Sequence, residues 1–397
     1  MRRLLIYSIL AILVFFILST VMFLFWTDLA HMKIIDSEQP VVYLVYTSAG
    51  SMPELLNTSQ IDAFITYEPI ISTSVLGGIG KEIATQSDLP PPGQWNRSAC
   101  NILVMSDNFI DENHEDAALI TALITAGIKR VNEDPLLAEN ISAEWVFGSG
   151  PIISAGASLD PMEVENRSFP TLTFTKDANL PNITDTLSNS EEYSAEIKIM
   201  DQQYRNNSVY KRSLELLSGS QPNVTGNIPT INIGYLPSTD HYAPLYVAVE
   251  DSEYFCNKYD FCLVMSAKEH GRPTYCTLNV DGKVVANVNL VQGSSGGGLM
   301  TNMGQNAIDI GCLGSVPAEL QVVSGNNATI IQSINTGGTG IVVNNRLPCS
   351  DWNSFVSVIK ERSMENNQIK IATVQSSIQE EIIREALEYE DIRVNQF

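Results

Sequence analysis

The chain has 397 residues, of which 44% are hydrophobic and 17% are charged. This length predicts about two or three domains, and the composition excludes a disordered or fibrous chain. Lys and Arg total 23 against 45 Asp and Glu, and the resulting net charge of -22 argues against a nucleic-acid backbone as the main partner. The four histidines stand at 31, 114, 241 and 270, a spacing too wide for a metal site.

The first predicted element is a membrane-spanning helix. Residues 4–26 are apolar apart from Ser8, Ser19 and Thr20, and about 20 apolar residues are enough to cross a bilayer. Two arginines precede this stretch and acidic residues follow it, so the positive-inside rule places the chain after about residue 30 outside the cytoplasm. A cleaved signal peptide is the alternative, although its apolar region is usually shorter, about 7–15 residues. We expect residues 1–30 to be an uncleaved anchor and the protein to be a single-pass cell-membrane protein.

Two further features agree with an extracytoplasmic location. Asn-x-Ser/Thr sequons, the acceptor motif of N-glycosylation, occur at Asn57, Asn96, Asn140, Asn166, Asn182, Asn206, Asn223 and Asn327. Cysteines, in an even number that is compatible with disulfides, occur at 100, 256, 262, 276, 312 and 349. Their spacing makes Cys256 and Cys262 the expected pair, with buried free thiols as the alternative state.

Residues 41–150 alternate strand-like and helix-like signals. Strands are expected at 41–46, 61–67 and 101–106, and helices at 52–56, within 107–133 and at 135–147. Residues 148–228 are poorer in periodic signal and hold one helical stretch, at 191–217. Residues 218–229 (SGSQPNVTGNIP) have the composition of a linker.

After the linker the alternation resumes. Strands are expected at 231–236, 307–310, 330–334, 340–343 and 369–373, and helices at 243–250, 299–305, 318–323, 352–362 and 378–388. Residues 274–291 are predicted to form a hairpin about Asp281-Gly282, a strong two-residue turn signal. Such repeated alternation predicts an α/β architecture in which helices cover sheets.

Six segments of the chain together resemble one known family. Four of them are INIGYLPSTDHYAPLYVA (231–248), GGLMTNMGQNAIDIGCLGSVPA (297–318), INTGGTGIVV (334–343) and IATVQSSIQEEIIREAL (371–387). The other two are MPELLNTSQIDAFITYEP (52–69) and ACNILVMSDNFIDENHEDAALITALITAGIKRVN (99–132). The first four resemble the first half, and the other two the second half, of the nitrate/sulfonate/taurine-type solute-binding proteins of ABC importers. The resemblance implies a periplasmic-binding-protein-like (type II) clamp, in which two α/β lobes close on a small ligand.

The two halves stand in the reverse of the family's order. One interpretation is a natural circular permutation in which residues 218–229 join the old termini, and the other is a fragment of a tandem array. Residues 41–46 and 392–397 both fit the same strand position, which slightly favours the tandem origin. The resemblance implies these divisions: lobe one at 230–365, the family's C-terminal region packing on it at 100–217, and lobe two assembled from 40–98 and 366–397.

The resemblance places the ligand in a cleft between the lobes, where helices begin. Ser315 follows Gly314 and is the expected N-cap of one predicted helix, and Ser376 and Ser377 follow Gln375 at the opening of another. Free backbone N–H groups at helix starts bind anions. Ordinary capped helices without a ligand are the alternative at both places.

Polar residues at strand ends complete the expected site, since strand ends line ligand crevices in open α/β sheets. They are Tyr235, Thr239, Asp240, His241, Asn335, Thr336, Tyr67 and Glu68. Tyr67 is expected to stack on a planar ligand or donate its hydroxyl. Glu68 is expected to bind an amine of the ligand, with a structural hydrogen bond at the strand end as the alternative. The glycine-rich residues 293–298 lack the lysine of a phosphate loop and are interpreted as a flexible entry into the next helix.

The sequence holds no catalytic motif, and we expect no enzyme activity and no cofactor. We expect an extracytoplasmic solute-binding protein that captures a small solute for the permease and ATPase of an ABC importer. The solute classes considered are sulfonate- or taurine-like, nitrate-like and aminopyrimidine, with a zwitterionic or mildly polar organic solute preferred over a bare anion. The alternatives are a ligand-sensing ectodomain with the same clamp, an enzyme of this fold that makes a pyrimidine precursor, and a non-functional fragment of a tandem binding protein.

Overall fold

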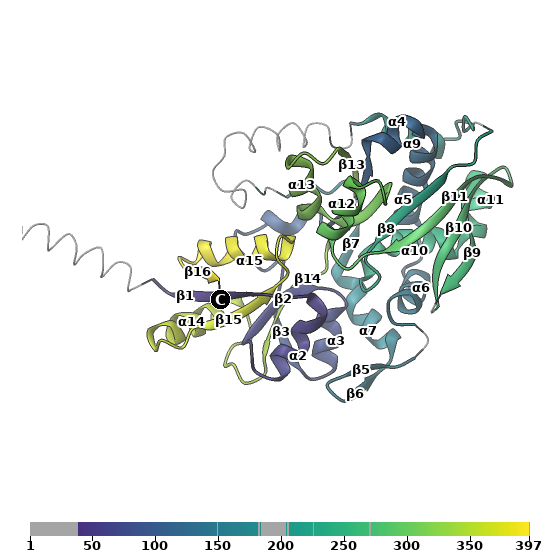
Figure 1. The fold of residues 1–397 in the computed structure, drawn as a ribbon. Helices are drawn as coiled ribbons and strands as arrows, with labels where there is room; N and C mark the ends of the chain where they lie inside the picture. The colour runs from purple at the N-terminus through teal and green to yellow at the C-terminus, as the bar shows by residue number, and fades with distance from the viewer. Residues whose placement is uncertain are drawn as a thin grey trace, which may run out of the picture.

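A computed structural model describes residues 39–148, 150–181, 183, 204, 206–224, 226–269 and 271–396 (Figure 1). These residues form two lobes, each built on one mixed β-sheet with helices packed on it, so the predicted α/β architecture is confirmed. The predicted membrane helix lies outside the described residues. Within the described ranges, no helix is long and apolar enough to cross a membrane.

Eight strands form the sheet of the larger lobe, lobe one, in the order β7-β13-β4-β12-β8-β11-β10-β9. Their bounds are β4 Asn101–Ser106, β7 Leu172–Phe174, β8 Thr230–Tyr235, β9 Phe261–Glu269, β10 Arg272–Val280, β11 Lys283–Gln292, β12 Ile310–Gly314 and β13 Ala328–Gly337. β4 lies antiparallel between β12 and β13. A strand from before the linker is therefore inserted among strands from after it, so the two halves of the chain form one sheet.

The helices of lobe one pack on both faces of this sheet. They are α4 Asp107–Glu112, α5 His114–Glu133, α6 Pro135–Phe147, α7 Pro161–Ser168, α9 Ser208–Leu217, α10 Ala243–Glu250, α11 Ser252–Tyr259, α12 Gly296–Gly304 and α13 Ser315–Val323. α5 packs so closely against α10 that position 127 has room only for glycine. A Cβ on Gly127 would lie 2.3 Å from the carbonyl oxygen of Pro244. The predicted helical stretch 191–217 is confirmed over α9, and most of the remainder lies outside the described residues.

Six strands form the sheet of the smaller lobe, lobe two, in the order β16-β1-β15-β2-β14-β3. Their bounds are β1 Val41–Tyr46, β2 Ala63–Tyr67, β3 Gly80–Thr85, β14 Thr339–Asn344, β15 Ile369–Thr373 and β16 Arg393–Gln396. The accompanying helices are α2 Met52–Asn57, α3 Ile70–Leu76, α14 Trp352–Met364 and α15 Ile378–Tyr389. β1 pairs in parallel with both β15 and β16. The two segments expected to fit one strand position therefore lie side by side, and that expectation is wrong.

The chain passes between the lobes at two neighbouring places. It enters β4 through Cys100, whose N–H donates to the carbonyl of Asn335 at 3.0 Å, and it returns to lobe two through Gly337 and Gly338. Both glycines have positive φ, 86° and 71°, and a Cβ on Gly338 would lie 2.3 Å from Leu172. β14 and α14 therefore belong to lobe two, so the structure differs from the expected end of lobe one at residue 365. A strand pattern does not specify in which sheet the strand finds its partners.

Two local predictions are confirmed in lobe one. β10 and β11 form the expected hairpin, and Asp281 and Gly282 at its turn both have positive φ. Cys256 and Cys262 form the expected disulfide, whereas the remaining cysteines, at 100, 276, 312 and 349, are buried free thiols. A short hairpin of β5 Ile152–Ser154 and β6 Ala157–Leu159, and the edge strand β9, were not predicted.

Candidate ligand-binding site

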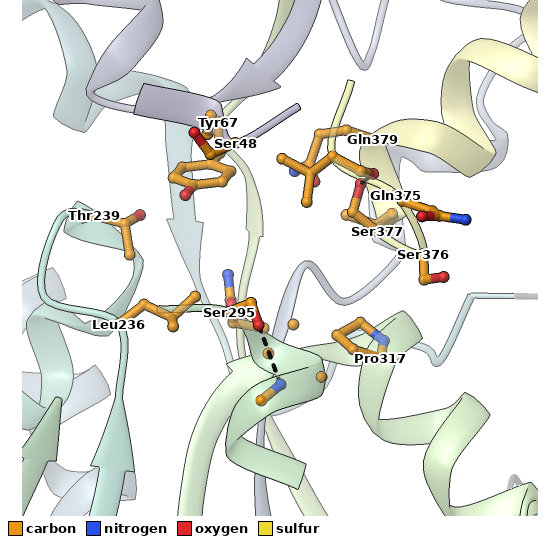
Figure 2. A pocket seen from close by; sticks show the side chains of 18 of the residues that line it. Ser48, Tyr67, Leu236, Thr239, Ser295, Pro317, Gln375, Ser376, Ser377 and Gln379 are labelled. Carbon is orange, nitrogen blue, oxygen red and sulfur yellow. Dashed lines mark hydrogen bonds between the residues drawn. The ribbon is translucent and has the colours of Figure 1, made fainter. Parts of the chain in front are cut away.

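A cavity of about 650 Å³ lies between the two lobes. Figure 2 shows Tyr67 and Gln379 of lobe two on one side of it, and Leu236, Ser295 and Pro317 of lobe one on the other. Lobe two lines it with residues 46–49, 67 and 374–379, and lobe one with residues 100, 101, 236, 239, 241, 242, 294–298, 314, 317, 320 and 321. The structure thus provides a cleft where the resemblance implies one.

Seven of the thirteen predicted site residues line this cavity: Tyr67, Thr239, His241, Gly314, Gln375, Ser376 and Ser377. The other six lie outside its lining: Glu68, Tyr235, Asp240, Ser315, Asn335 and Thr336. The ring of Tyr235 is a core side chain, packed 5.7 Å from the Trp145 ring, centroid to centroid. Thr336 is buried, and its hydroxyl lies 3.4 Å from the Gln86 amide.

Helices α12, α13 and α15 begin at the cavity. The Ser295 hydroxyl caps α12 by accepting from the N–H of Gly298 at 3.1 Å (Figure 2). The glycine-rich segment 294–298 leads into α12 as expected, although the helix already begins at Gly296, and it also forms a wall of the cleft, which was not predicted. A serine immediately before a helical stretch is an N-cap signal, and it was available in the sequence.

The other two helix starts use their serines differently. At α13 the N-cap is Gly314, and the predicted cap Ser315 instead donates its hydroxyl to the carbonyl of Ala99 at 2.6 Å. Ser377 caps α15 as expected, accepting from the N–H of Glu380 at 3.2 Å. The Glu380 carboxylate accepts from the N–H of Ser376 at 2.7 Å. At α13 no side chain caps the helix, and the N–H of Ser315 donates to the carbonyl of Cys100 at 3.0 Å. Each of the three helix starts therefore has at least one N–H that is already held by the protein.

His241 lies in the cavity lining with a fixed tautomer. Its Nδ1 accepts from the side-chain amides of Asn101, at 2.7 Å, and Asn335, at 3.1 Å. In the same network the Tyr242 hydroxyl donates to the Asn101 amide oxygen at 2.9 Å, which leaves the Asn101 nitrogen to face the ring. The ring proton must therefore sit on Nε2, beside Gly338. Burial lowers the pKa of His241 to about 3, although the Gly338 carbonyl opposes the shift, so the ring is a neutral donor.

The Glu68 side chain points away from the cavity. Its carboxylate accepts from the N–H of Ser72 at 3.0 Å and from the Ser72 hydroxyl at 2.9 Å. Burial raises the pKa of Glu68 to about 8, against the lowering effect of the Ser72 N–H. The expectation that Glu68 binds an amine of the ligand is therefore wrong, and the structural hydrogen bond at the strand end is what the structure shows.

Asp240 belongs to the same buried group of carboxyls as Glu68. The Ser168 hydroxyl of α7 donates to Asp240, and burial raises the pKa of this carboxyl to about 6. The neighbouring Glu165 is also fully buried, and burial together with Asp240 raises its pKa. Thr239 joins the lobes at this point, because its hydroxyl donates to the backbone carbonyl of Glu68 at 2.9 Å.

The residues that line the cavity include no Lys, Arg, Asp or Glu. The cleft offers neutral groups instead: hydroxyls, amides, the imidazole of His241 and backbone N–H groups. In the part of the chain that the structure describes, no group of three or more His, Cys, Asp or Glu is arranged to hold a metal ion. Such a surface recognises a ligand by hydrogen bonds and ring contacts rather than by salt bridges.

Comparison with known proteins gives two matches. The model of the NMT1-like family matches residues 16–145 and 225–396, which is most of the chain. An uncharacterized protein of Methanocaldococcus jannaschii is 35% identical over 127 residues, which cover 31% of this chain and 83% of that relative. No solved structure matches the chain.

Proposed function

Because the chain belongs to the NMT1-like family, a family of solute-binding proteins, we propose that it captures a small solute for the permease and ATPase of an ABC importer. This family is the nitrate/sulfonate/taurine type expected from the sequence, so that part of the prediction is confirmed. The observation that carries the proposal is the cavity between the lobes, which is lined from both sides by hydrogen-bonding groups. The chain crossings at Cys100 and at Gly337 and Gly338 are short segments at strand ends, the kind of segment that acts as a hinge when lobes close on a ligand.

The character of the lining supports a polar organic solute as the ligand. A bare nitrate fills only a small part of about 650 Å³, and no cationic side chain lines the cavity to neutralise it. An acceptor group of the solute, such as a sulfonate, carboxylate or ring carbonyl, fits the start of α12. The flat or apolar part of the solute fits against Tyr67, whose ring meets His241 edge-on at 6.0 Å between centroids.

We also propose that residues 1–30 anchor the protein and that the body lies on the extracytoplasmic side. The length and flanking charges of residues 4–26 support the anchor. The disulfide between Cys256 and Cys262 supports the location, since such bonds persist in oxidising compartments. The insertion of β4 into the sheet of lobe one supports a permuted arrangement of one complete clamp over an isolated fragment.

A thermal-shift panel on the full chain in detergent tests the proposed function. The panel holds taurine, alkyl sulfonates, nitrate, bicarbonate and aminopyrimidines. A bound solute at 100 times its Kd should add ~2.7 kcal/mol to the free energy of unfolding. Tyr67→Ala should abolish this shift, whereas Tyr389→Ala, a change to an exposed tyrosine outside the cavity, should preserve it. A shift with nitrate alone that survives Tyr67→Ala contradicts the proposed ligand class.

A further inference from the structure

The N-glycosylation motifs of this chain sit at the surface. The structure describes seven of the eight sequon asparagines, and all seven are exposed: Asn57, Asn96, Asn140, Asn166, Asn206, Asn223 and Asn327. None of them lines the cavity. Asparagine is not exposed throughout this protein, since Asn101 and Asn335 are buried. A bulky glycan on the sequon asparagines would therefore meet solvent and leave the cleft open.

The hydroxyl residue two positions later divides six of these motifs into two groups, and that of the Asn223 motif, Thr225, lies outside the described residues. An enzyme that reads Asn-x-Ser/Thr must reach both the amide and the hydroxyl. Three hydroxyl residues are buried, at Ser98, Ser142 and Ser168. Thr329 is partly buried, and its hydroxyl already donates to Asp107 at 2.7 Å.

Ser59 and Ser208 are the exposed counterparts in the motifs of Asn57 and Asn206. Asn57 is the last residue of α2, and Ser59 has a positive φ of 58° where the chain turns away from that helix. Asn206 precedes α9, and the Ser208 hydroxyl is exposed, 2.9 Å from the His114 ring. Both motifs lie at helix ends, one on each lobe, where the connecting chain has room for a substituent.

We propose that Asn57 and Asn206 are N-glycosylated on the folded protein by transfer from a polyprenyl-phosphate-linked glycan. The side-chain amide nitrogen attacks the anomeric carbon of the first sugar, so that a C–N bond forms. The C–O bond to phosphate breaks, the polyprenyl phosphate leaves with the electron pair, and the amide proton passes to a base of the transferase. The transfer involves no oxidation or reduction. The inference rests on the extracytoplasmic location proposed above.

Peptide mass spectrometry tests the inference on the full chain purified from membranes of the cells that make it. We expect glycopeptides that contain Asn57 and Asn206, and unmodified peptides that contain Asn96, Asn140 and Asn166. Ser59→Ala and Ser208→Ala should each remove the glycan from the asparagine two positions earlier, whereas replacement of the same serines by Thr should retain it. Unmodified Asn57 and Asn206, or glycans on Asn140 and Asn166, would overturn the inference.

Two measurements separate this inference from the proposed function. Protease accessibility in intact cells reports the side of the membrane, so an accessible body with unmodified Asn57 and Asn206 refutes the glycosylation alone. The Asn57→Gln/Asn206→Gln double variant should bind solute with unchanged affinity, because neither residue lines the cavity. A tenfold loss of affinity in this variant would contradict the separation of the glycan sites from the cleft.

Discussion

Glu68→Gln should stabilise the protein at alkaline pH and flatten the pH dependence of its stability. Burial raises the pKa of Glu68 from 4.5 to about 8. Between these values the native state holds a proton that the unfolded state has released, so the free energy of unfolding falls as pH rises through this window. The difference of 8 - 4.5 = 3.5 pKa units sets a ceiling of ~5 kcal/mol. Gln cannot ionise, and its oxygen still accepts from the N–H of Ser72.

Urea unfolding at about pH 5, 7 and 9 measures this effect. The variant and the wild type should be within ~1 kcal/mol of each other at pH 5, and the variant should be more stable by ~2–4 kcal/mol at pH 9, where local opening keeps the gain below the ceiling. Glu54→Gln, at an exposed glutamate, is the control and should change little. Solute affinity should not change, because Glu68 does not line the cavity. A variant with wild-type pH dependence but weakened binding would refute the reasoning and would indicate that Glu68 contacts the ligand.

Three further predictions concern the crossing and the cleft. Gly338→Ala should cost ~1–3 kcal/mol in unfolding experiments, since the new Cβ would clash with Leu172 at positive φ; an unchanged denaturation midpoint contradicts this. Ser295→Ala should weaken solute binding about tenfold or more through loss of the α12 cap, whereas Ser106→Ala, which removes the cap of α4 outside the cavity, should not; equal affinities in a titration would exclude α12 from the site. The His241 ring should show no NMR titration step between about pH 5 and 8, because its pKa is about 3, and a step near pH 6.5 would contradict its neutral state.

The sequence predicted those parts of the site that depend on chain order and helix starts. Tyr67 ends a buried strand and Ser377 precedes an amphipathic helix, and both line the cavity. The sequence did not show which way the strand-end side chains point. Neighbouring residues of an extended chain project to opposite sides, so the prediction that both Tyr67 and Glu68 line one cleft conflicts with strand geometry, and only Tyr67 lines it. Ser315 differs for a similar reason: as the first helical residue after Gly314, it turns its hydroxyl to the chain crossing at Ala99.

The assembly of the two lobes was harder to predict from the sequence than the individual strands and helices. Each strand that the sequence predicted was found close to its expected place, but pairing depends on contacts between residues far apart in the chain. β14 pairs with β2 and β3, which lie more than 250 positions earlier in the sequence, and no local sequence pattern predicts that pairing. β1 and β16 have similar strand signals, and only the structure shows that the lobe-two sheet accommodates both. The wall made by residues 294–298 was missed because a glycine-rich segment was judged by its resemblance to phosphate loops alone.

Titration calorimetry on the full chain, with the solute that gives the largest thermal shift, tests the cleft as the binding site most directly. We expect one solute per chain, loss of binding in Tyr67→Ala, and an affinity that changes little between about 0.1 and 1 M salt. The reason is that no charged side chain lines the cavity, so there is little charge for salt to screen. A solute whose affinity falls steeply with salt and survives Tyr67→Ala would show that it is held by charges elsewhere on the protein, and would contradict capture between the lobes.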